Sequence, residues 1–297
     1  MIYIYLRTNT RLGNWMFQYA AAASLGNDEI KFVSQDPKVI ELYSQYKNEV
    51  FHGTELVTDM PCDLPVYEEK GFAYEPIARP VASDFVLSGF FQSARYFDEG
   101  KIRSFFAPSE SRKKEIMRLF GDFLSRRNVT GISVRRTDYM TNAQYHPFCG
   151  KQYYRDCIAK LPEVKDFIVC SDDIAWCRSW FAREFPERNF FFVENAGILN
   201  QLYVHAFCKN IIMSNSSFCW WPAWLNENTG KRVFAPSMWF GYAYGRQGVN
   251  WHDIYFDGVE IVENRYTVAL FLRGLFSEFK QLCKIYAVKA RRRIIGR

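Results

Sequence analysis

Several features that would assign a 297-residue chain to a class at once are missing from this sequence. It has no run of about 18 apolar residues, so no membrane-spanning helix is predicted. The opening residues MIYIY lack the basic start and the apolar region of a signal peptide, and we therefore expect a cytoplasmic protein. The eight cysteines form no C-x-x-C pair, so neither a zinc ribbon nor a redox motif is predicted. We expect them to be reduced residues of the core and of helices.

An excess of basic over acidic charge is found only at the end of the chain. Of the net charge of +6, residues 264–297 carry +8, with nine Lys and Arg against one acid, Glu278, and the remainder carries −2. Such a body does not support nucleic-acid binding, which requires a basic surface. Apolar residues recur at helical spacing in the tail and predict a basic amphipathic helix over 263–297.

Two interpretations of this tail stay open. A basic amphipathic helix is typical of peripheral binding to a membrane, here the inner face. The same pattern also fits a terminal helix that docks its apolar face on the body of the protein. The two are compatible if only residues 288–297 are free.

The hydrophobic fraction of 48% and the charged fraction of 24% indicate a globular chain with a sizeable core. A strand over 2–6, a polar loop, a helix over 13–25 and a strand over 30–33 predict a β-α-β unit. Residues 51–80 are rich in proline and aromatics and predict irregular structure. A strand is expected over 85–91, a helix around Lys101 and a longer helix over 109–125. We place a domain boundary after this last helix, which gives a first domain of residues 1–127.

Residues 128–262 show a more regular alternation. Short apolar strands are predicted over 131–134, 166–170, 189–193, 211–213 and 233–235, with helices over 151–160, 174–185, 198–209 and 218–226 between them. This alternation indicates an α/β domain with a parallel, doubly wound sheet. Such sheets bind ligands at the carboxyl ends of their strands, so the loops that follow the strands are where a site is expected.

The first of these loops carries two adjacent arginines, Arg135 and Arg136, directly after a buried strand. Guanidinium groups are the bidentate, permanently charged donors that a pyrophosphate requires. An Arg–Asp ion pair at the edge of the sheet is the alternative. We expect Asp138 to be structural and to bond to its own loop.

Asp172 and Asp173 follow the next predicted strand along the chain. A carboxylate at the mouth of a nucleotide cleft can accept the paired N–H groups of guanine. Either residue could equally cap the helix that begins at Ile174. The two aspartates can also divide these tasks between them.

The third loop, SNSSF over residues 214–218, opens a helix that contains Trp220, Trp221 and Trp224. Hydroxyl groups and free backbone N–H groups at a helix N-terminus form an anion site, although an ordinary cap is the alternative. We expect the tryptophans to pack in the core. Pro222 is unusual inside a helix and indicates a kink or a later helix start.

Together the three loops predict a nucleotide-diphosphate site, yet the usual motifs for one are absent. The chain has no G-x-G-x-x-G, no P-loop and no D-x-D, the common metal clamp of sugar nucleotides. Arginines and helix dipoles must then neutralise the phosphates, and we expect neither a metal nor another cofactor.

At these loops and near its start the sequence resembles the alpha-1,2-fucosyltransferases of glycosyltransferase family 11. RLGNWMFQYA (residues 11–20) resembles the family's G-x-L-G-N-Q-M-F-Q-Y-A, and GFFQS with a following YF (residues 89–97) resembles its G-Y-F-Q-S segment. RRTD (residues 135–138) matches the H-x-R-R-x-D motif. SNSSF with WW and AWL (residues 214–225) matches S-N-S-S-F-S-W-W-x-A-W-L. The similarity spans roughly residues 3–240.

The resemblance implies a GT-B-like fold, in which two Rossmann-like domains face one another across a cleft. Residues 1–127 would then form the acceptor side, 128–262 the donor side and 263–297 the basic C-terminal helix. It further implies inverting transfer of L-fucose from GDP-L-fucose to the 2-hydroxyl of a galactose residue, as in bacterial polysaccharide biosynthesis. A lipid-linked acceptor would suit a membrane-facing tail.

By the same resemblance, Arg135 holds the β-phosphate and stabilises the departing GDP, and Asn14 is a second catalytic residue at the cleft. Gly13 permits the turn that places Arg11 and Asn14 there. The residues expected to bind the donor and its sugar are Arg11, Gly13, Asn14, Ser133, Arg135, Arg136, Asp172, Asp173, Asn215, Ser216, Ser217 and Phe218.

The sequence departs from the family pattern at two positions. Ser133 replaces the histidine of H-x-R-R-x-D, which is tied to donor binding in relatives, and Trp15 replaces a glutamine. We expect Trp15 to lie near the site and to shape the acceptor mouth. These departures keep two alternatives open: a transferase for another GDP-sugar or another linkage, and a catalytically silent relative that binds nucleotide or glycan.

Overall fold

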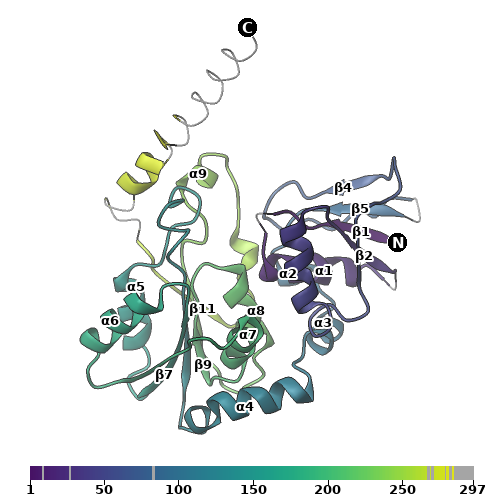
Figure 1. The fold of residues 1–297 in the computed structure, drawn as a ribbon. Helices are drawn as coiled ribbons and strands as arrows, with labels where there is room; N and C mark the ends of the chain where they lie inside the picture. The colour runs from purple at the N-terminus through teal and green to yellow at the C-terminus, as the bar shows by residue number, and fades with distance from the viewer. Residues whose placement is uncertain are drawn as a thin grey trace.

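The computed structural model describes residues 1–8, 10–26, 28–81, 84–265, 268, 271–277, 279–280 and 283. The chain forms two α/β halves that lie side by side (Figure 1), each with its own parallel sheet. The first sheet has the order β3-β2-β1-β5-β4. Its strands are β1 (Ile2–Tyr5), β2 (Ile30–Val33), β3 (Glu55–Val57), β4 (Val66–Glu68) and β5 (Phe85–Ser88).

The second sheet has the order β11-β10-β9-β6-β7-β8. Its strands are β6 (Thr130–Val134), β7 (Asp166–Ser171), β8 (Asn189–Phe192), β9 (Asn210–Ile212), β10 (Val233–Pro236) and β11 (Val259–Val262). The central strand β6 pairs on both sides, with Ser133 opposite Cys170 of β7 and Ile132 opposite Ile212 of β9. Buried apolar side chains from alternate positions cover both faces of this sheet, as expected for parallel strands.

Helices connect the strands in each half. They are α1 (Leu12–Ala23), α2 (Pro37–Tyr46), α3 (Glu99–Phe105), α4 (Glu110–Leu124), α5 (Lys151–Ala159), α6 (Ile174–Glu184), α7 (Ile198–Ala206), α8 (Ser217–Leu225) and the short α9 (Tyr242–Gly245). The predicted α/β fold with two parallel sheets is therefore confirmed. The later helix start suggested by Pro222 is wrong, because α8 begins at Ser217 and contains the proline.

Helix α4 packs on the second half, although the boundary at residue 127 assigns it to the first. Its Phe120 and Phe123 contact Phe191 of β8, with ring centroids 5.8 and 5.6 Å apart. Figure 1 shows α4 running along the base of the second half. The chain thus passes between the halves just before α4, near residues 106–109, and the boundary predicted from the basic turn at 126–127 lies too late.

One apolar core joins the two halves through α1 and α8. Phe17 of α1 packs against both Trp220 and Trp221 of α8, with centroids 4.6 and 4.8 Å away. Trp221 also donates its indole N–H to the Gly13 carbonyl at 2.9 Å. The three tryptophans of α8 are buried, which confirms that they are core residues.

The tail is described only in part. Residues 271–277 and 279–280 are helical, and the rest of the predicted helix over 263–297 falls largely outside the described residues. No helix in the described part of the chain is both long and apolar enough to cross a membrane. All eight cysteines are free thiols and six are buried, as predicted.

Candidate active site

A cleft of about 650 Å³ lies between the two halves. The carboxyl ends of β6, β7 and β9 open into it from the second half, and the start of α1 enters it from the first. It is lined by most of the residues that the sequence predicted for donor binding, namely Arg11, Gly13, Asn14, Ser133, Arg135, Asp172, Asn215, Ser216, Ser217 and Phe218. Trp15 and Asp138 line it as well.

The N-termini of α1 and α8 meet at this cleft. A Cβ atom on Gly13 would lie 2.6 Å from the backbone nitrogen of Phe218 and from the carbonyl carbon of Ser217. Gly13 does not adopt a left-handed conformation, so it is required for this close approach and not, as predicted, for the turn. Neither helix has an acidic residue in its first turn. The partial positive charges of two helix N-termini therefore lie close together at the cleft, which favours binding of an anion there.

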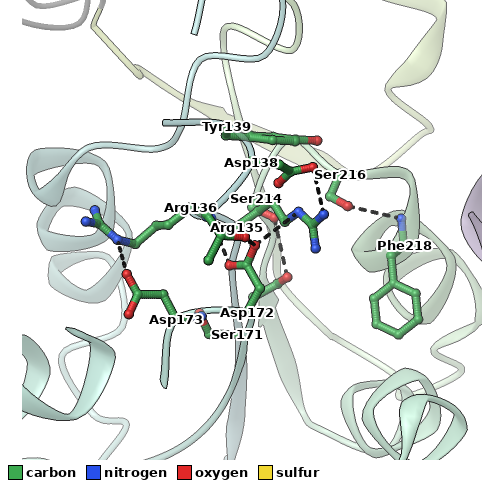
Figure 2. A network of polar contacts seen from close by, with 12 residues as sticks. Arg135, Arg136, Asp138, Tyr139, Ser171, Asp172, Asp173, Ser214, Ser216 and Phe218 are labelled. Atoms are coloured by element: carbon green, nitrogen blue, oxygen red, sulfur yellow. Dashed lines mark hydrogen bonds and ion pairs between the residues drawn. The ribbon is translucent and has the colours of Figure 1, made fainter. Parts of the chain in front are cut away.

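Arg135 adds a fixed positive charge beside these helix ends. Its guanidinium group donates to Asp138 at 2.9 Å and forms an ion pair with Asp172 at 3.3 Å. Figure 2 shows the group held on the same side as Ser216 and Phe218. The two carboxylates fix its position while about a third of the side chain stays exposed to the cleft. Asp138 bonds within its own loop, as expected.

Arg136 turns away from the cleft, contrary to prediction. Its Nε donates to Asp173 at 3.1 Å and its guanidinium carbon lies 3.9 Å from the centre of the Trp176 ring. Figure 2 shows it extended toward Asp173, away from Arg135. Both arginines follow β6, which ends at Val134, so the loop and its partners set their directions and strand alternation does not. Ser133, Val134 and Arg135 all line the cleft, whereas Arg136 does not.

The two aspartates after β7 have separate structural contacts. Asp173 caps α6 by accepting the N–H of Trp176 at 3.2 Å, and it does not line the cleft. Its predicted contact with the donor is thus not supported, whereas the cap is confirmed. Asp172 accepts the backbone N–H groups of Arg136 and Thr137 at 2.9 and 3.2 Å. This carboxylate therefore holds the arginine loop on the sheet, and its assignment to guanine stays a prediction.

The loop over 214–218 divides its roles in a similar way. Ser216 caps α8 by accepting the N–H of Phe218 at 3.3 Å. The hydroxyl groups of Ser133 and Ser214 lie 3.4 Å apart on the cleft floor. Asn215 is 1% exposed, and its amide donates to the carbonyls of Pro147 and Trp239 at 2.7 and 2.9 Å. The Asn215 side chain therefore holds three loops together. The prediction that it binds the donor is not supported by these contacts.

The first half presents a polar pair to the cleft. Asn14 accepts a hydrogen bond from the Gln92 amide at 2.8 Å. Trp15 is fully buried, donates to the Thr10 hydroxyl at 2.8 Å and packs on Tyr46. It thus supports the wall of the cleft from behind, and any influence on the acceptor passes through neighbours such as Tyr46.

Glu69 fixes the loop that carries Gln92. Its carboxylate accepts the backbone N–H groups of Phe90 at 2.6 Å and Phe91 at 3.0 Å. Phe91 has a left-handed backbone with φ of 52°, and the pair of hydrogen bonds offsets the cost of that conformation. Burial raises the pKa of Glu69 to about 7. The sequence prediction missed this residue, which lies in the segment expected to be irregular.

Two imidazole groups in the cleft were also missed. His146 stacks on Tyr139 with centroids 5.1 Å apart, and burial lowers its pKa below the usual range. His205 lies over Gly131, and burial lowers its pKa to about 4. Both are therefore neutral near pH 7. Among the described residues, no group of three or more His, Cys, Asp and Glu side chains is placed to hold a metal ion.

The sequence of this chain is similar to those of known glycosyltransferases. The sequence profile described as "Glycosyl transferase family 11" matches residues 4–240. The "O-antigen biosynthesis glycosyltransferase WbnK" of Escherichia coli is 29% identical over 176 residues, or 54% of this chain and 57% of its own. An "Alpha-1,2-colitosyltransferase" of Escherichia coli is 33% identical over 166 residues, or 51% and 55%. The chain spans little more than half the length of these curated relatives.

A solved structure is also similar. It is that of the NodZ alpha-1,6-fucosyltransferase soaked with GDP-fucose, with 15% identity and a TM-score of 0.50. The match covers 75% of this chain and 92% of that chain. At this identity the likeness concerns the fold alone, and it agrees with the predicted GT-B-like architecture.

Proposed function

Because the chain belongs to glycosyltransferase family 11, we propose that it transfers L-fucose from GDP-L-fucose to a galactose residue of a glycan. The observation that carries this proposal is the convergence of Arg135 with the N-termini of α1 and α8 in one cleft. A diphosphate is the anion that suits two helix ends and a guanidinium group. The donor named in the NodZ structure gives further support.

In the proposed reaction, the bond between fucose C1 and the β-phosphate oxygen breaks while the acceptor 2-hydroxyl attacks C1 from the opposite face. The configuration at C1 is thereby inverted, and the electron pair leaves on GDP. Arg135 and the two helix ends stabilise the charge that develops on the phosphate, so no metal is needed. Asn14 and Gln92 bind sugar hydroxyls from the other side of the cleft.

The acceptor hydroxyl must lose a proton, and we assign it to His146. This imidazole is neutral, lines the cleft and lies beside the aromatic wall formed by Phe240 and Tyr244. His146→Gln should lower kcat about tenfold or more and leave the KM for the donor unchanged. The matched variant His252→Gln replaces an exposed histidine outside the cleft and should change neither value. A His146→Gln enzyme with normal kcat would remove the histidine from the mechanism.

The function itself is tested by incubating the protein with GDP-fucose and lactose, measuring GDP release and determining the linkage of the product by NMR. An α-linked fucose on the galactose 2-hydroxyl, formed equally well in EDTA, is expected. Product that carries fucose at another hydroxyl would refute the linkage. Activity lost in EDTA and restored by a divalent cation would refute the metal-free mechanism.

A second candidate is the same reaction with another GDP-sugar. The relative named for colitose transfer favours it, because that name gives the same linkage with a different sugar. Turnover of GDP-colitose and not of GDP-fucose would identify this case. Binding of GDP by calorimetry without any turnover on a panel of acceptors would instead indicate a silent relative.

A further inference from the structure

The described part of the tail packs in an unusual way, because its docked face is small and polar. Gly274 is buried, and a Cβ atom there would lie 2.9 Å from the ring of Tyr242. The hydroxyl of Ser277 donates to the Thr141 carbonyl and accepts from the Gln144 amide. Phe271 completes this face by packing on Tyr242, with centroids 5.2 Å apart. The helix is therefore attached to the loop that follows the arginines of the cleft.

The opposite face is the more apolar one, and it is exposed. Val268, Leu272, Phe276 and Phe279 have 76%, 57%, 61% and 64% of their surface exposed, and Leu275 lies among them. At 100° per residue these positions form a single stripe, nearly opposite Gly274 and Ser277. We call it the tail stripe. A soluble helix normally turns such a stripe toward the core, so this one is oriented for contact with another apolar surface.

Basic side chains flank the tail stripe. The ammonium group of Lys280 lies 4.5 Å from the centre of the Phe276 ring, and Arg273 is exposed. Both belong to the segment 264–297, where nine basic residues face one acid. Two copies of so basic a segment would repel one another, which opposes self-association through this face. Apolar side chains rimmed by basic ones instead match a bilayer with anionic headgroups.

We propose that the tail stripe binds the surface of an anionic membrane, with its apolar side chains in the headgroup boundary and Arg273 and Lys280 on the lipid phosphates. Val268 of the tail stripe lines an apolar groove of about 530 Å³ together with Phe271, Tyr242 and Phe240. Phe240 lines both the groove and the cleft, so the membrane-facing surface and the site adjoin. An acceptor glycan anchored in that membrane by a lipid would meet the cleft there, an extension that rests on the proposed function.

The test uses the full chain and vesicles of phosphatidylcholine, alone or mixed with phosphatidylglycerol. The wild type should sediment with the mixed vesicles, bind pure phosphatidylcholine weakly, and lose binding as salt is raised. The double variant Phe276→Asp/Phe279→Asp should lower the partition constant at least about tenfold, and Arg273→Glu/Lys280→Glu should do the same for mixed vesicles only. Met117→Asp, at an exposed apolar position of α4, is the matched control and should bind normally.

Failure to bind mixed vesicles, or equal binding by the wild type and both double variants, would overturn the proposal. So would a wild-type dimer that the phenylalanine variant dissociates, since the stripe would then be a contact between copies. Turnover of GDP-fucose with lactose, which needs no membrane, is measured on the same samples. If lactose turnover is absent while vesicle binding is as expected, the proposed function is refuted and the proposal that the tail stripe binds membranes is retained.

Discussion

Two consecutive arginines have different proposed roles, Arg135 in the reaction and Arg136 in the fold. Arg135→Ala removes the guanidinium group from the cleft, and we expect kcat/KM for the donor to fall about 100- to 1,000-fold, as for loss of one preorganised donor. Arg136→Ala instead breaks the contacts with Asp173 and Trp176 and should cost about 1–2 kcal/mol of unfolding free energy. Its kcat/KM should stay near that of the wild type.

Steady-state kinetics with GDP-fucose and thermal unfolding of both variants measure these effects. Arg135→Lys adds a graded comparison, because a point charge replaces the bidentate fork. An Arg136→Ala enzyme that is stable but as inactive as Arg135→Ala would contradict the assignment of Arg136 to the fold.

The half-buried carboxylate of Glu69 makes a pH dependence testable. Its pKa is raised from 4.5 to about 7 by burial, so the folded state holds this proton more tightly than the unfolded state does. The sign follows by linkage: stability from this group is fully present below about pH 4.5 and is lost as pH rises through about 7. The unfolding free energy of the wild type should therefore include a fall on the order of 2 kcal/mol across this window.

Glu69→Gln cannot ionise, and the fall should disappear from urea titrations of this variant between pH 5 and pH 8. Glu68→Gln, at the exposed neighbouring position, serves as the control and should keep the wild-type profile. Identical profiles for all three proteins would mean that the Glu69 carboxylate has an ordinary pKa in the fold.

At the scale of elements, the close approach of α1 and α8 depends on one missing side chain. Gly13→Ala places a methyl group 2.6 Å from the backbone of α8, where no flexible side chain can move aside. We expect the helices to separate, lowering both the unfolding free energy by about 1–3 kcal/mol and the affinity for GDP. Gly121→Ala in α4 is the matched change, because its new Cβ would contact only the Met117 side chain, with the terminal methyl group nearest at 3.4 Å.

That control should stabilise the protein by about 0.5–1 kcal/mol, the usual gain of alanine over glycine in a helix, and leave GDP affinity unchanged. Calorimetry with GDP and chemical denaturation of the two variants measure both quantities. If Gly13→Ala raised the unfolding free energy as Gly121→Ala does, α1 and α8 would not be too close to accommodate a methyl group at residue 13.

The sequence predicted strands β6 to β10 well and the edge strands β3 and β4 of the first sheet poorly, for a physical reason. Strands β6, β7, β9 and β10 are largely buried, and β8 contains three consecutive phenylalanines; the predicted bounds of all five lie within two residues of the structure. Strands β3 and β4 have three residues each, with polar side chains and little burial, and they were hidden in the segment 51–80. Helix α2 was also missed, although Asp36 and Pro37 form a recognisable start signal.

Most residues of the site were predicted from the sequence, but the directions of their side chains were not. Motifs placed Arg135, Asn14 and Ser216 in the cleft, where the structure has them. Both arginines lie beyond β6, which ends at Val134, so the period of two along a strand does not separate them. No local pattern could have shown that Gly13 contacts a helix some two hundred residues later, because that contact exists only once both halves have folded.

For the whole molecule, the aromatic core shared by α1 and α8 determines how the two sheets unfold. Phe17, Trp220 and Trp221 are fully buried between the halves, so neither half can unfold without exposing them. We expect one cooperative calorimetric transition, with calorimetric and van't Hoff enthalpies in agreement. GDP at about 100 times its Kd should stabilise that single transition by about 2.7 kcal/mol, since residues of both halves line the proposed site.

Phe17→Ala tests the shared core directly. It removes the ring that packs on both tryptophans and should cost about 3–5 kcal/mol of unfolding free energy, shifting the transition to lower temperature. Because Phe17 does not line the cleft, GDP should still stabilise the variant. Val66→Ala, at an exposed position on the edge strand β4, provides the comparison and should leave the transition where it is. Two separate transitions in the wild type, only one of them raised by GDP, would mean that the halves fold independently and that the cleft forms between preassembled units.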